Sequence, residues 1–239
     1  MQAFIRETIK ACQEVVMMLE SNADENAYTP QKHGAGGDLS VGLDLMAEDI
    51  FIKRLGRFGQ INSEESGLIG SKSDLQIVLD PIDGSDNLLT HFPYYGASIA
   101  YMKDNKPLIG IVCNFPNGDI FIKDDKQFLQ GKLHSAHFKP VKKHHTSKVG
   151  LFEKAALYPE ITQKLIQNRL KYRAPGAVAL SLAYAHYVNY MVFLGKMREY
   201  DLEAGLYMCE DLHMYKDDTH IIISKDKEVF ERVKKIIIG

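Results

Sequence analysis

The stretch VLDPIDGSDNLL, residues 78–89, places two aspartates, Asp80 and Asp83, three positions apart around a proline. Residues 75–79 are apolar and predict a buried strand, so Asp80 is expected where that strand leaves the core. Pro81 stiffens the backbone, and Asp83 is expected on the same side of the turn as Asp80. Two carboxylates that converge in this way repel each other unless a cation lies between them. Hard oxygen ligands suit Mg²⁺ or Mn²⁺, so the pair predicts a metal site.

The residues that follow this pair predict a phosphate site beside the metal. Gly84 permits a tight turn, Ser85 offers a hydroxyl, and residues 86–90 can open a helix. The free backbone N–H groups of a helix start bind anions, and the natural anion beside a divalent metal is phosphate. The alternative is an Asx turn with a helix N-cap, which explains one aspartate and the serine without any ligand.

Length and composition favour a globular chain that binds a small diffusible molecule. The chain has 239 residues, of which 45% are hydrophobic and 25% charged, with a formal net charge of -2. This charge gives no reason to expect nucleic acid or an anionic membrane as a partner. Cys12, Cys113 and Cys209 form no CxxC pair and indicate buried thiols in a reducing compartment. With no signal-peptide pattern and no apolar run of ~20 residues, we expect a soluble, cytoplasmic protein.

Hydrophobic periodicity predicts two helices and a sheet in the first half of the chain. Apolar residues recur at helical spacing over residues 4–19 and 43–55, and the stretch 28–40 between them predicts a loop or irregular hairpin. A sheet, antiparallel in character, is predicted by three strand-like runs, over residues 59–66, 75–80 and 95–124. We expect these elements to form a first domain over residues 1–125.

The second half, residues 126–239, alternates between strands and helices and predicts an α/β layer of its own. Strands are predicted over residues 147–152 and 190–195, and helices over residues 158–168, 176–189 and 201–209, before a final strand and helix in 220–238. The polar stretch 124–148 joins the two halves. Its lysines and histidines favour a solvated basic loop over a grip for an anionic ligand.

Further acidic motifs stand on both sides of the opening stretch. Glu64 and Glu65, in NSEES, precede the buried strand, and Asp201 stands far downstream in YDLEAG. With these elements the chain resembles the inositol monophosphatase family, within the superfamily that includes fructose-1,6-bisphosphatases and bisphosphate nucleotidases. The family patterns match at Glu64-Glu65, at residues 80–87 and at residues 200–205.

Two more segments match the family in the same order along the chain. GDLSVGLD matches at Asp38 and Asp44, and YRAPGAVALSLA matches at Arg173 and Gly176. Separated elements in register are far more specific than any one of them alone.

The resemblance implies an α/β (α+β) fold, a layered α-β-α-β-α sandwich, and a homodimer. It implies two or three Mg²⁺ ions, with Mn²⁺ as the alternative, held by the side chains of Glu64, Asp80, Asp83 and Asp201 and by the backbone carbonyl of Ile82. Phosphate and substrate contacts are implied for Asp83, Gly84, Ser85, Gly176 and Asp201. Ser85 and Asp44 would form the relay that, with Glu64, orients and deprotonates a metal-activated water.

The expected function is that of a Mg²⁺-dependent phosphomonoesterase acting on a small sugar, polyol or inositol phosphate. Its alternatives are a fructose-1,6-bisphosphatase or a 3'(2'),5'-bisphosphate nucleotidase and, more remotely, a non-catalytic regulator that binds metal and anion. A phosphate ester among so many carboxylates would be repelled without cations, so metals belong to the substrate site.

The chain departs from the family pattern in the segment before Asp201. Leu194 stands where inositol-specific members place a glutamate that holds a substrate hydroxyl. Lys196 and Arg198 follow it and are interpreted either as a grip for a second phosphate or as solvated cations. Tyr200 replaces a frequent tryptophan, which affects packing. The three histidines near these motifs are given no catalytic role: His33, His91 and His186.

Overall fold

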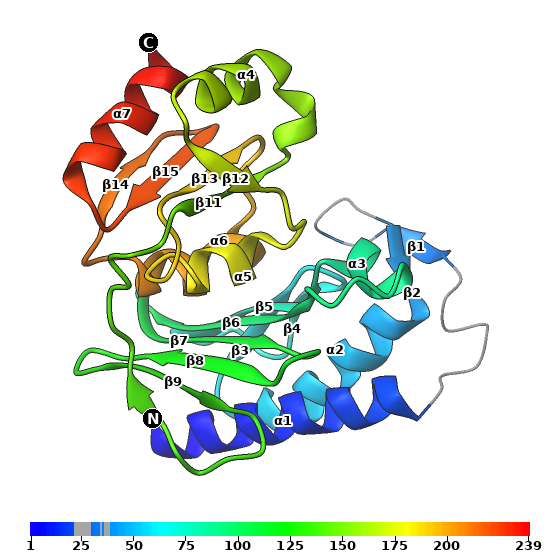
Figure 1. Ribbon diagram of the computed structural model, residues 1–239. Coiled ribbons are helices and arrows are strands. Elements are labelled where there is room, and N and C mark those ends of the chain that lie inside the picture. Colours follow the sequence, from blue (N-terminus) through cyan, green and yellow to red (C-terminus); the bar gives the residue numbers. More distant parts are fainter. Residues whose placement is uncertain (22–29, 34, 36–38) are drawn as a thin grey trace.

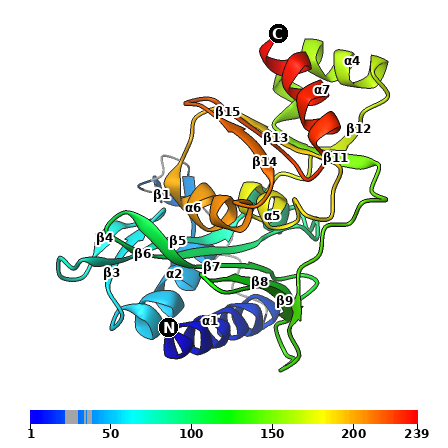
Figure 2. The same ribbon diagram turned by 90° about the vertical axis from the view of Figure 1, so that its left-hand side faces the viewer.

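The computed structural model describes residues 1–21, 30–33, 35 and 39–239. Helices and two large sheets alternate in layers (Figures 1 and 2). In order, the layers are α1 (Gln2–Glu20) with α2 (Gly42–Leu55), an eight-stranded sheet, α5 (Val178–Ala183) with α6 (Glu199–Met208), a five-stranded sheet, and α4 (Pro159–Gln167) with α7 (Lys227–Ile238). This arrangement confirms the α-β-α-β-α sandwich that the sequence predicts.

The eight-stranded sheet has the strand order β10-β9-β8-β7-β6-β5-β3-β4. Its strands are β3 (Gln60–Ser63), β4 (Gly67–Ile69), β5 (Leu75–Asp83), β6 (Gly96–Lys103), β7 (Lys106–Asn114), β8 (Asp119–Lys123), β9 (Phe128–Lys132) and β10 (Lys139–Pro140). All neighbours are antiparallel except β3 and β5, which run parallel. The parallel pair departs from the antiparallel sheet expected, and it places the carboxyl ends of β3 and β5 at the same edge.

The five-stranded sheet has the strand order β12-β11-β13-β15-β14. Its strands are β11 (Val149–Glu153), β12 (Lys171–Arg173), β13 (Met191–Leu194), β14 (His213–Lys216) and β15 (His220–Ser224), and a short 3₁₀ helix, η2 (Ala155–Leu157), follows β11. Strand β11 runs parallel to both of its neighbours, β12 and β13. The α/β character expected of the second half is confirmed.

Most helices begin and end within two residues of the ranges expected from the sequence. The exception is α5, predicted over residues 176–189 but present only as Val178–Ala183, with turns after it. Before α2, the strands β1 (Pro30–His33) and β2 (Leu39–Val41) pair antiparallel, in agreement with the hairpin alternative for residues 28–40. Residues 22–29, 34 and 36–38 lie outside the described part of the chain.

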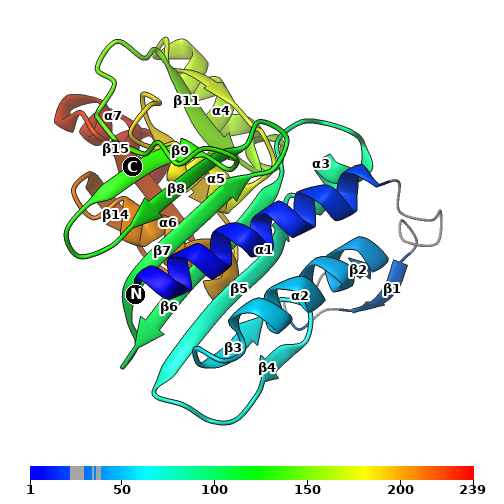
Figure 3. The same ribbon diagram turned by 90° about the horizontal axis from the view of Figure 1, so that it is seen from below.

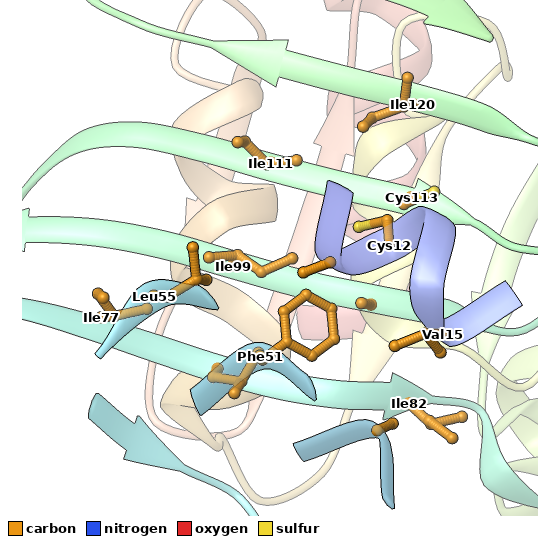
Figure 4. Close-up of a cluster of buried hydrophobic side chains, with 14 of the residues drawn as sticks. Cys12, Val15, Phe51, Leu55, Ile77, Ile82, Ile99, Ile111, Cys113 and Ile120 are labelled. Atoms are coloured by element: carbon orange, nitrogen blue, oxygen red, sulfur yellow. The ribbon is translucent and has the colours of Figure 1, made fainter. Parts of the chain in front are cut away.

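The helices α1 and α2 lie side by side across one face of the large sheet (Figure 3). Cys12 and Val15 of α1 and Phe51 of α2 are fully buried against strand residues such as Ile77 and Ile99 (Figure 4). All three cysteines are free and buried, as predicted. Burial of these apolar side chains holds the helices on the sheet and leaves its other face to α5 and α6.

Glycines allow α6 to approach the large sheet and α5 closely. A Cβ atom on Gly110 of β7 would lie 3.0 Å from the carbonyl oxygen of Ala204, and one on Gly205 of α6 would lie 2.5 Å from the Cβ atom of Leu182. Larger residues at these positions would push the layers apart. The glycine of the YDLEAG motif therefore helps to bring the start of α6, which carries Asp201, toward the edge of the large sheet.

The polar stretch 124–148 contributes strands β9 and β10 to the large sheet before the chain crosses to β11. Lys142, His144 and His145 are exposed loop residues, whereas Lys143 pairs with Asp211 at 3.0 Å. A domain boundary at residues 125–126 stays a prediction. Among the described residues, none of the helices combines the length and apolar character that crossing a bilayer requires.

Candidate active site

A cavity of about 590 Å³ lies where the carboxyl ends of β3 and β5 meet the end of β11 and the starts of α3 (Ser85–Leu89) and α5. Most of the residues singled out from the sequence line it: Asp44, Glu64, Asp80, Ile82, Asp83, Gly84, Ser85 and Gly176. Its size suits a small organic ligand. The predicted site residues, which come from distant parts of the chain, are therefore brought together.

Three buried carboxylates form the most concentrated cluster at this cavity. Single carboxylate oxygens of Glu64, Asp80 and Asp201 all lie within 4.8 Å of one another. Glu64 directly follows β3 and its backbone N–H donates to the carbonyl of Leu79, 3.0 Å away, so the parallel pairing of β3 with β5 sets it beside Asp80. Oxygen ligands grouped in this way fit a hard divalent cation such as Mg²⁺.

The environment of these carboxylates opposes their ionisation. Burial, helped by the charges of Asp201 and Glu65 and opposed by Arg198, raises the pKa of Glu64 to about 7. Burial also raises the pKa of Asp80 well above its usual range, and the neighbouring charges of Glu64 and Asp83 add to this rise. A bound cation would favour the ionised forms, so the cluster calls for compensation by positive charge.

Arg198 supplies positive charge to this cluster from within the chain. Its Nη1 donates to Glu64 Oε1 at 2.7 Å, its Nε donates to Asp201 Oδ2 at 2.8 Å, and its Nη2 reaches Asp201 Oδ1 at 3.3 Å. Arg198 lines the cavity, whereas the exposed Lys196 does not belong to the lining found among the described residues. Only one of the two cations considered for a second phosphate therefore faces the cavity, and its guanidinium contacts carboxylates.

The hydroxyl of Ser85 lies beside the carboxylate of Asp44. Ser85 Oγ is 3.1 Å from Asp44 Oδ1 and 3.0 Å from the backbone carbonyl oxygen of Ile82, and as a hydroxyl it donates its single proton to one acceptor at a time. Asp44 belongs to the first turn of α2 and is buried. The two residues of the predicted relay are thus in hydrogen-bond contact.

The backbone around Gly84 has a shape that few other residues permit. Gly84 has φ 89°, and a Cβ atom there would lie 3.1 Å from the Cβ atom of Ala177. Asn87, at the end of the matched segment, donates its Nδ2 to the carbonyls of Tyr94 and Pro175, each at 2.7 Å. The motif's glycine and asparagine therefore join the turn after β5 to the segment before α5.

The structure also contains the Asx turn of the alternative interpretation, which explains the opening stretch without a ligand. The N–H of Ile82 donates to Asp80 Oδ1 at 3.0 Å, which closes a turn of the Asx kind. Asp80 thus shapes its own turn and also faces the other carboxylates of the cluster. The two interpretations of the opening stretch are compatible.

Asp83 makes contacts that its sequence position did not predict. Its Oδ1 accepts the N–H of Val178 and its Oδ2 accepts the N–H of Leu180, both at 3.0 Å. Asp83 therefore caps the start of α5 and is not in the cluster of oxygens within 4.8 Å found among the described residues. A role as metal ligand stays a prediction for Asp83, which also ties the large sheet to the helix layer above it.

Glu153 and Lys154, at the end of β11, also line the cavity and were not singled out from the sequence. Glu153 is buried and accepts the N–H of Gly176 at 2.9 Å and the hydroxyl of Ser181 at 2.5 Å. Lys154 has φ 61°, and its Nζ lies 5.2 Å from the ring centroid of Phe193. The sequence feature that could have revealed them is a charged pair, Glu153-Lys154, directly after a predicted strand that ends in apolar residues. An acidic residue directly after an apolar strand is also what identified Asp80.

Other residues named from the sequence lie away from the cavity or cannot be placed. Leu194 is buried in β13 with the side chains between the small sheet and its outer helices. Arg173 is exposed and donates to the carbonyl of Tyr172 at 2.9 Å. Tyr200, in the tryptophan position, reaches Asn62 Oδ1 at 3.3 Å. Asp38 lies outside the described residues.

Comparison with known proteins identifies the family of this chain. The model of the inositol monophosphatase family matches residues 1–212, so the chain belongs to that family. The family resemblance inferred from the motifs is thereby confirmed.

Relatives and solved structures agree with this membership. The chain is 28% identical over 156 residues to the fructose-1,6-bisphosphatase of Pyrococcus furiosus, and the match covers 64% of this chain and 58% of the relative. It is 37% identical over 111 residues to the fructose-1,6-bisphosphatase/inositol-1-monophosphatase of Thermococcus kodakarensis, and the match covers 45% of this chain and 42% of the relative. The matches thus span about half the length of these curated relatives.

A solved inositol monophosphatase–fructose 1,6-bisphosphatase superposes with a TM-score of 0.81, covering 98% of this chain and 99% of that one. Its sequence identity is 19%, so this likeness concerns the fold. The whole layered architecture is shared.

Proposed function

We propose that the chain is a Mg²⁺-dependent phosphomonoesterase that acts on a small sugar, polyol or inositol phosphate. The observation that carries the proposal is the cluster of buried oxygens from Glu64, Asp80 and Asp201, within 4.8 Å of one another. Glu64 and Asp80 of this cluster line the same cavity as the hydrogen-bonded pair of Ser85 and Asp44. Oxygen ligands for a divalent cation and a proton-accepting relay are the two parts that phosphate ester hydrolysis by water requires.

Each group of side chains has a definite part in this proposal. Metal ions would be held by Glu64, Asp80, Asp83, Asp201 and the carbonyl of Ile82, and when bound they neutralise phosphate charge and increase the acidity of water. The Ser85 hydroxyl, placed between Asp44 and the turn, orients the attacking water and passes its proton toward Asp44. The backbone N–H groups of Gly84 and Ser85 would hold the phosphate, with Gly176 at the substrate wall.

The cations of the cavity support a substrate with a second anionic group. Lys154 projects from the end of β11, in the second half of the chain, whereas the proposed phosphate turn follows β5 in the first half. A lysine in the lining of the cavity can pair with a second phosphate of the substrate. The names of the relatives, fructose-1,6-bisphosphatase among them, support a doubly phosphorylated sugar as the first candidate.

Replacing Lys154 by alanine is expected to raise KM for fructose-1,6-bisphosphate by about 10- to 100-fold, because a hydrogen bond to a charged group is worth about 1.5–3 kcal/mol. KM for inositol-1-phosphate and kcat for both substrates should change little. Steady-state phosphate release measures both constants. Lys196→Ala is the matched control, since it removes an equal charge from an exposed position outside the cavity lining. Equal effects of Lys154→Ala on both substrates would show that Lys154 does not select for the second phosphate.

The alternatives are separated by a substrate screen. Purified protein with Mg²⁺ would be assayed for phosphate release from sugar phosphates, inositol phosphates and nucleotide bisphosphates. Preference for a nucleotide bisphosphate would favour the nucleotidase alternative. Binding of Mg²⁺ and phosphate without release from any ester would favour a non-catalytic regulator.

A further inference from the structure

The guanidinium of Arg198 occupies a position that bears on how the carboxylate cluster binds cations. We propose that Arg198 is a resident counter-cation, which holds Glu64 and Asp201 in the metal-free protein and competes with the divalent cation for their oxygens. Arg198 thereby sets the metal affinity of the site. This inference rests on the proposed function, because it takes the cluster as the metal site, and it concerns how that site is regulated.

The contacts of Arg198 join two of the three carboxylates in the cluster. Nη1 is 2.7 Å from Glu64 Oε1 and Nε is 2.8 Å from Asp201 Oδ2, while Nη2 reaches the second oxygen of Asp201 at 3.3 Å. The planar fork of a guanidinium suits this two-pronged contact with a carboxylate. One side chain therefore neutralises ligands that come from the turn after β3 and from the start of α6.

The position of Arg198 in the chain makes this contact a built-in feature. Arg198 is the last residue before α6, has an extended backbone with φ −122° and ψ 130°, and lies three residues before Asp201. The chain thus delivers a cation and an acidic ligand to the cluster from the same helix start. Its side chain is 25% exposed and lines the cavity.

Charge makes the arginine and a divalent cation rivals. Both are attracted to the oxygens of Glu64 and Asp201, and two cations on the same carboxylates repel each other in a partly buried site. Both oxygens of Asp201 already accept from the guanidinium, so an Asp201 oxygen that turns toward a metal ion weakens this contact. Metal binding therefore includes an unfavourable free-energy contribution from weakening the contacts of Arg198. Removing the arginine should eliminate that contribution and increase the metal affinity.

The test is a calorimetric titration of metal-stripped protein with Mg²⁺ alone, which does not depend on turnover. Arg198→Met keeps most of the apolar stem and removes the charge. An opposite charge next to a carboxylate shifts its proton affinity by about one to three powers of ten. By the same electrostatics, Arg198→Met should bind Mg²⁺ at least about tenfold more tightly than the wild type. In chelator the melting temperature of Arg198→Met should fall below that of the wild type. Addition of Mg²⁺ should raise the melting temperature of the variant by more than it raises that of the wild type.

Two further variants make the titration specific. Lys196→Ala removes a like charge two residues away, at an exposed position, and should leave the Mg²⁺ affinity unchanged. Arg198→Lys retains the charge but not the fork, and its affinity should lie between those of the wild type and Arg198→Met. If Arg198→Met unfolds in chelator, the titration of Arg198→Lys decides, and tighter binding than the wild type is then required.

The outcomes distinguish this inference from the proposed function. Equal or weaker Mg²⁺ binding by the Arg198 variants would overturn competition, because Arg198 would then be holding the ligands in place for the metal. Failure of the wild type to bind any divalent cation would instead overturn the metal site, and with it both proposals.

Discussion

Asp80→Asn is expected to abolish phosphate release while the protein stays folded. Asparagine has nearly the same shape, and its side-chain oxygen can still accept the N–H of Ile82, which Asp80 Oδ1 does at 3.0 Å. The charge that draws a cation to the cluster is lost, however. Removing a residue that hydrogen-bonds to a metal ligand lowers metal affinity or activity by about 10- to 100-fold. Loss of a ligand itself should therefore lower turnover by more than ~100-fold. Phosphate release in saturating Mg²⁺ measures the effect.

The control for Asp80→Asn is Asp74→Asn, the same change at an exposed residue just before β5. It should retain wild-type activity. In chelator, Asp80→Asn should melt at the same or a higher temperature than the wild type, because one of several mutually repelling buried carboxylates has been removed. Substantial turnover by folded Asp80→Asn would contradict the assignment of Asp80 as a metal ligand.

Ser85→Ala is expected to lower kcat by about 10²- to 10⁴-fold, the usual contribution of a positioned acid or base. KM should change little, because the backbone N–H proposed to hold the phosphate is unaffected. The physical reason is the contact between Ser85 Oγ and Asp44 Oδ1, 3.1 Å apart, through which a proton can leave the attacking water. Steady-state kinetics separates the two constants.

Thr90→Val is a matched control for the loss of this hydroxyl. Thr90 closes the other end of α3, where its Oγ1 donates to the carbonyl of Asp86 at 2.8 Å. Its replacement tests whether a general weakening of α3 explains the effect, and kcat should stay within a few-fold of the wild type. A rise in KM with unchanged kcat for Ser85→Ala would show that the hydroxyl binds substrate and does not activate water.

The sequence was sufficient for the parts of the site that depend on local pattern. An apolar run followed at once by Asp80 predicts a strand that ends at this carboxylate. In the structure β5 continues to Asp83, so Asp80 lies inside the strand and is buried. The turn at Gly84 follows from the same motif, and the contact of Ser85 with Asp44, from the separate segment GDLSVGLD, follows from the family resemblance. The N-terminal helix α1 was found because its apolar stripe has a clear helical period. Helix α2 also buries residues at helical spacing, although its buried face includes the acidic residues Asp44 and Glu48.

Pairing between distant segments was not predictable in the same way. Nothing in the run around β3 reveals that it lies parallel to β5, although this pairing sets Glu64 beside Asp80. The contacts of Arg198 with Glu64 also depend on tertiary structure, across 134 residues of sequence. Since Arg198 follows a glycine and a lysine in a polar segment, sequence alone favoured solvent or substrate as its partner.

The proposed function requires that this cavity hydrolyse phosphate esters with the help of a divalent cation. The most direct measurement is phosphate release by metal-stripped wild-type protein from fructose-1,6-bisphosphate and inositol-1-phosphate, first in chelator and then with increasing Mg²⁺. We expect no release in chelator and recovery with Mg²⁺ for at least one of the two esters, with Asp80→Asn inactive throughout. Undiminished release in chelator, or release by Asp80→Asn equal to that of the wild type, would contradict it.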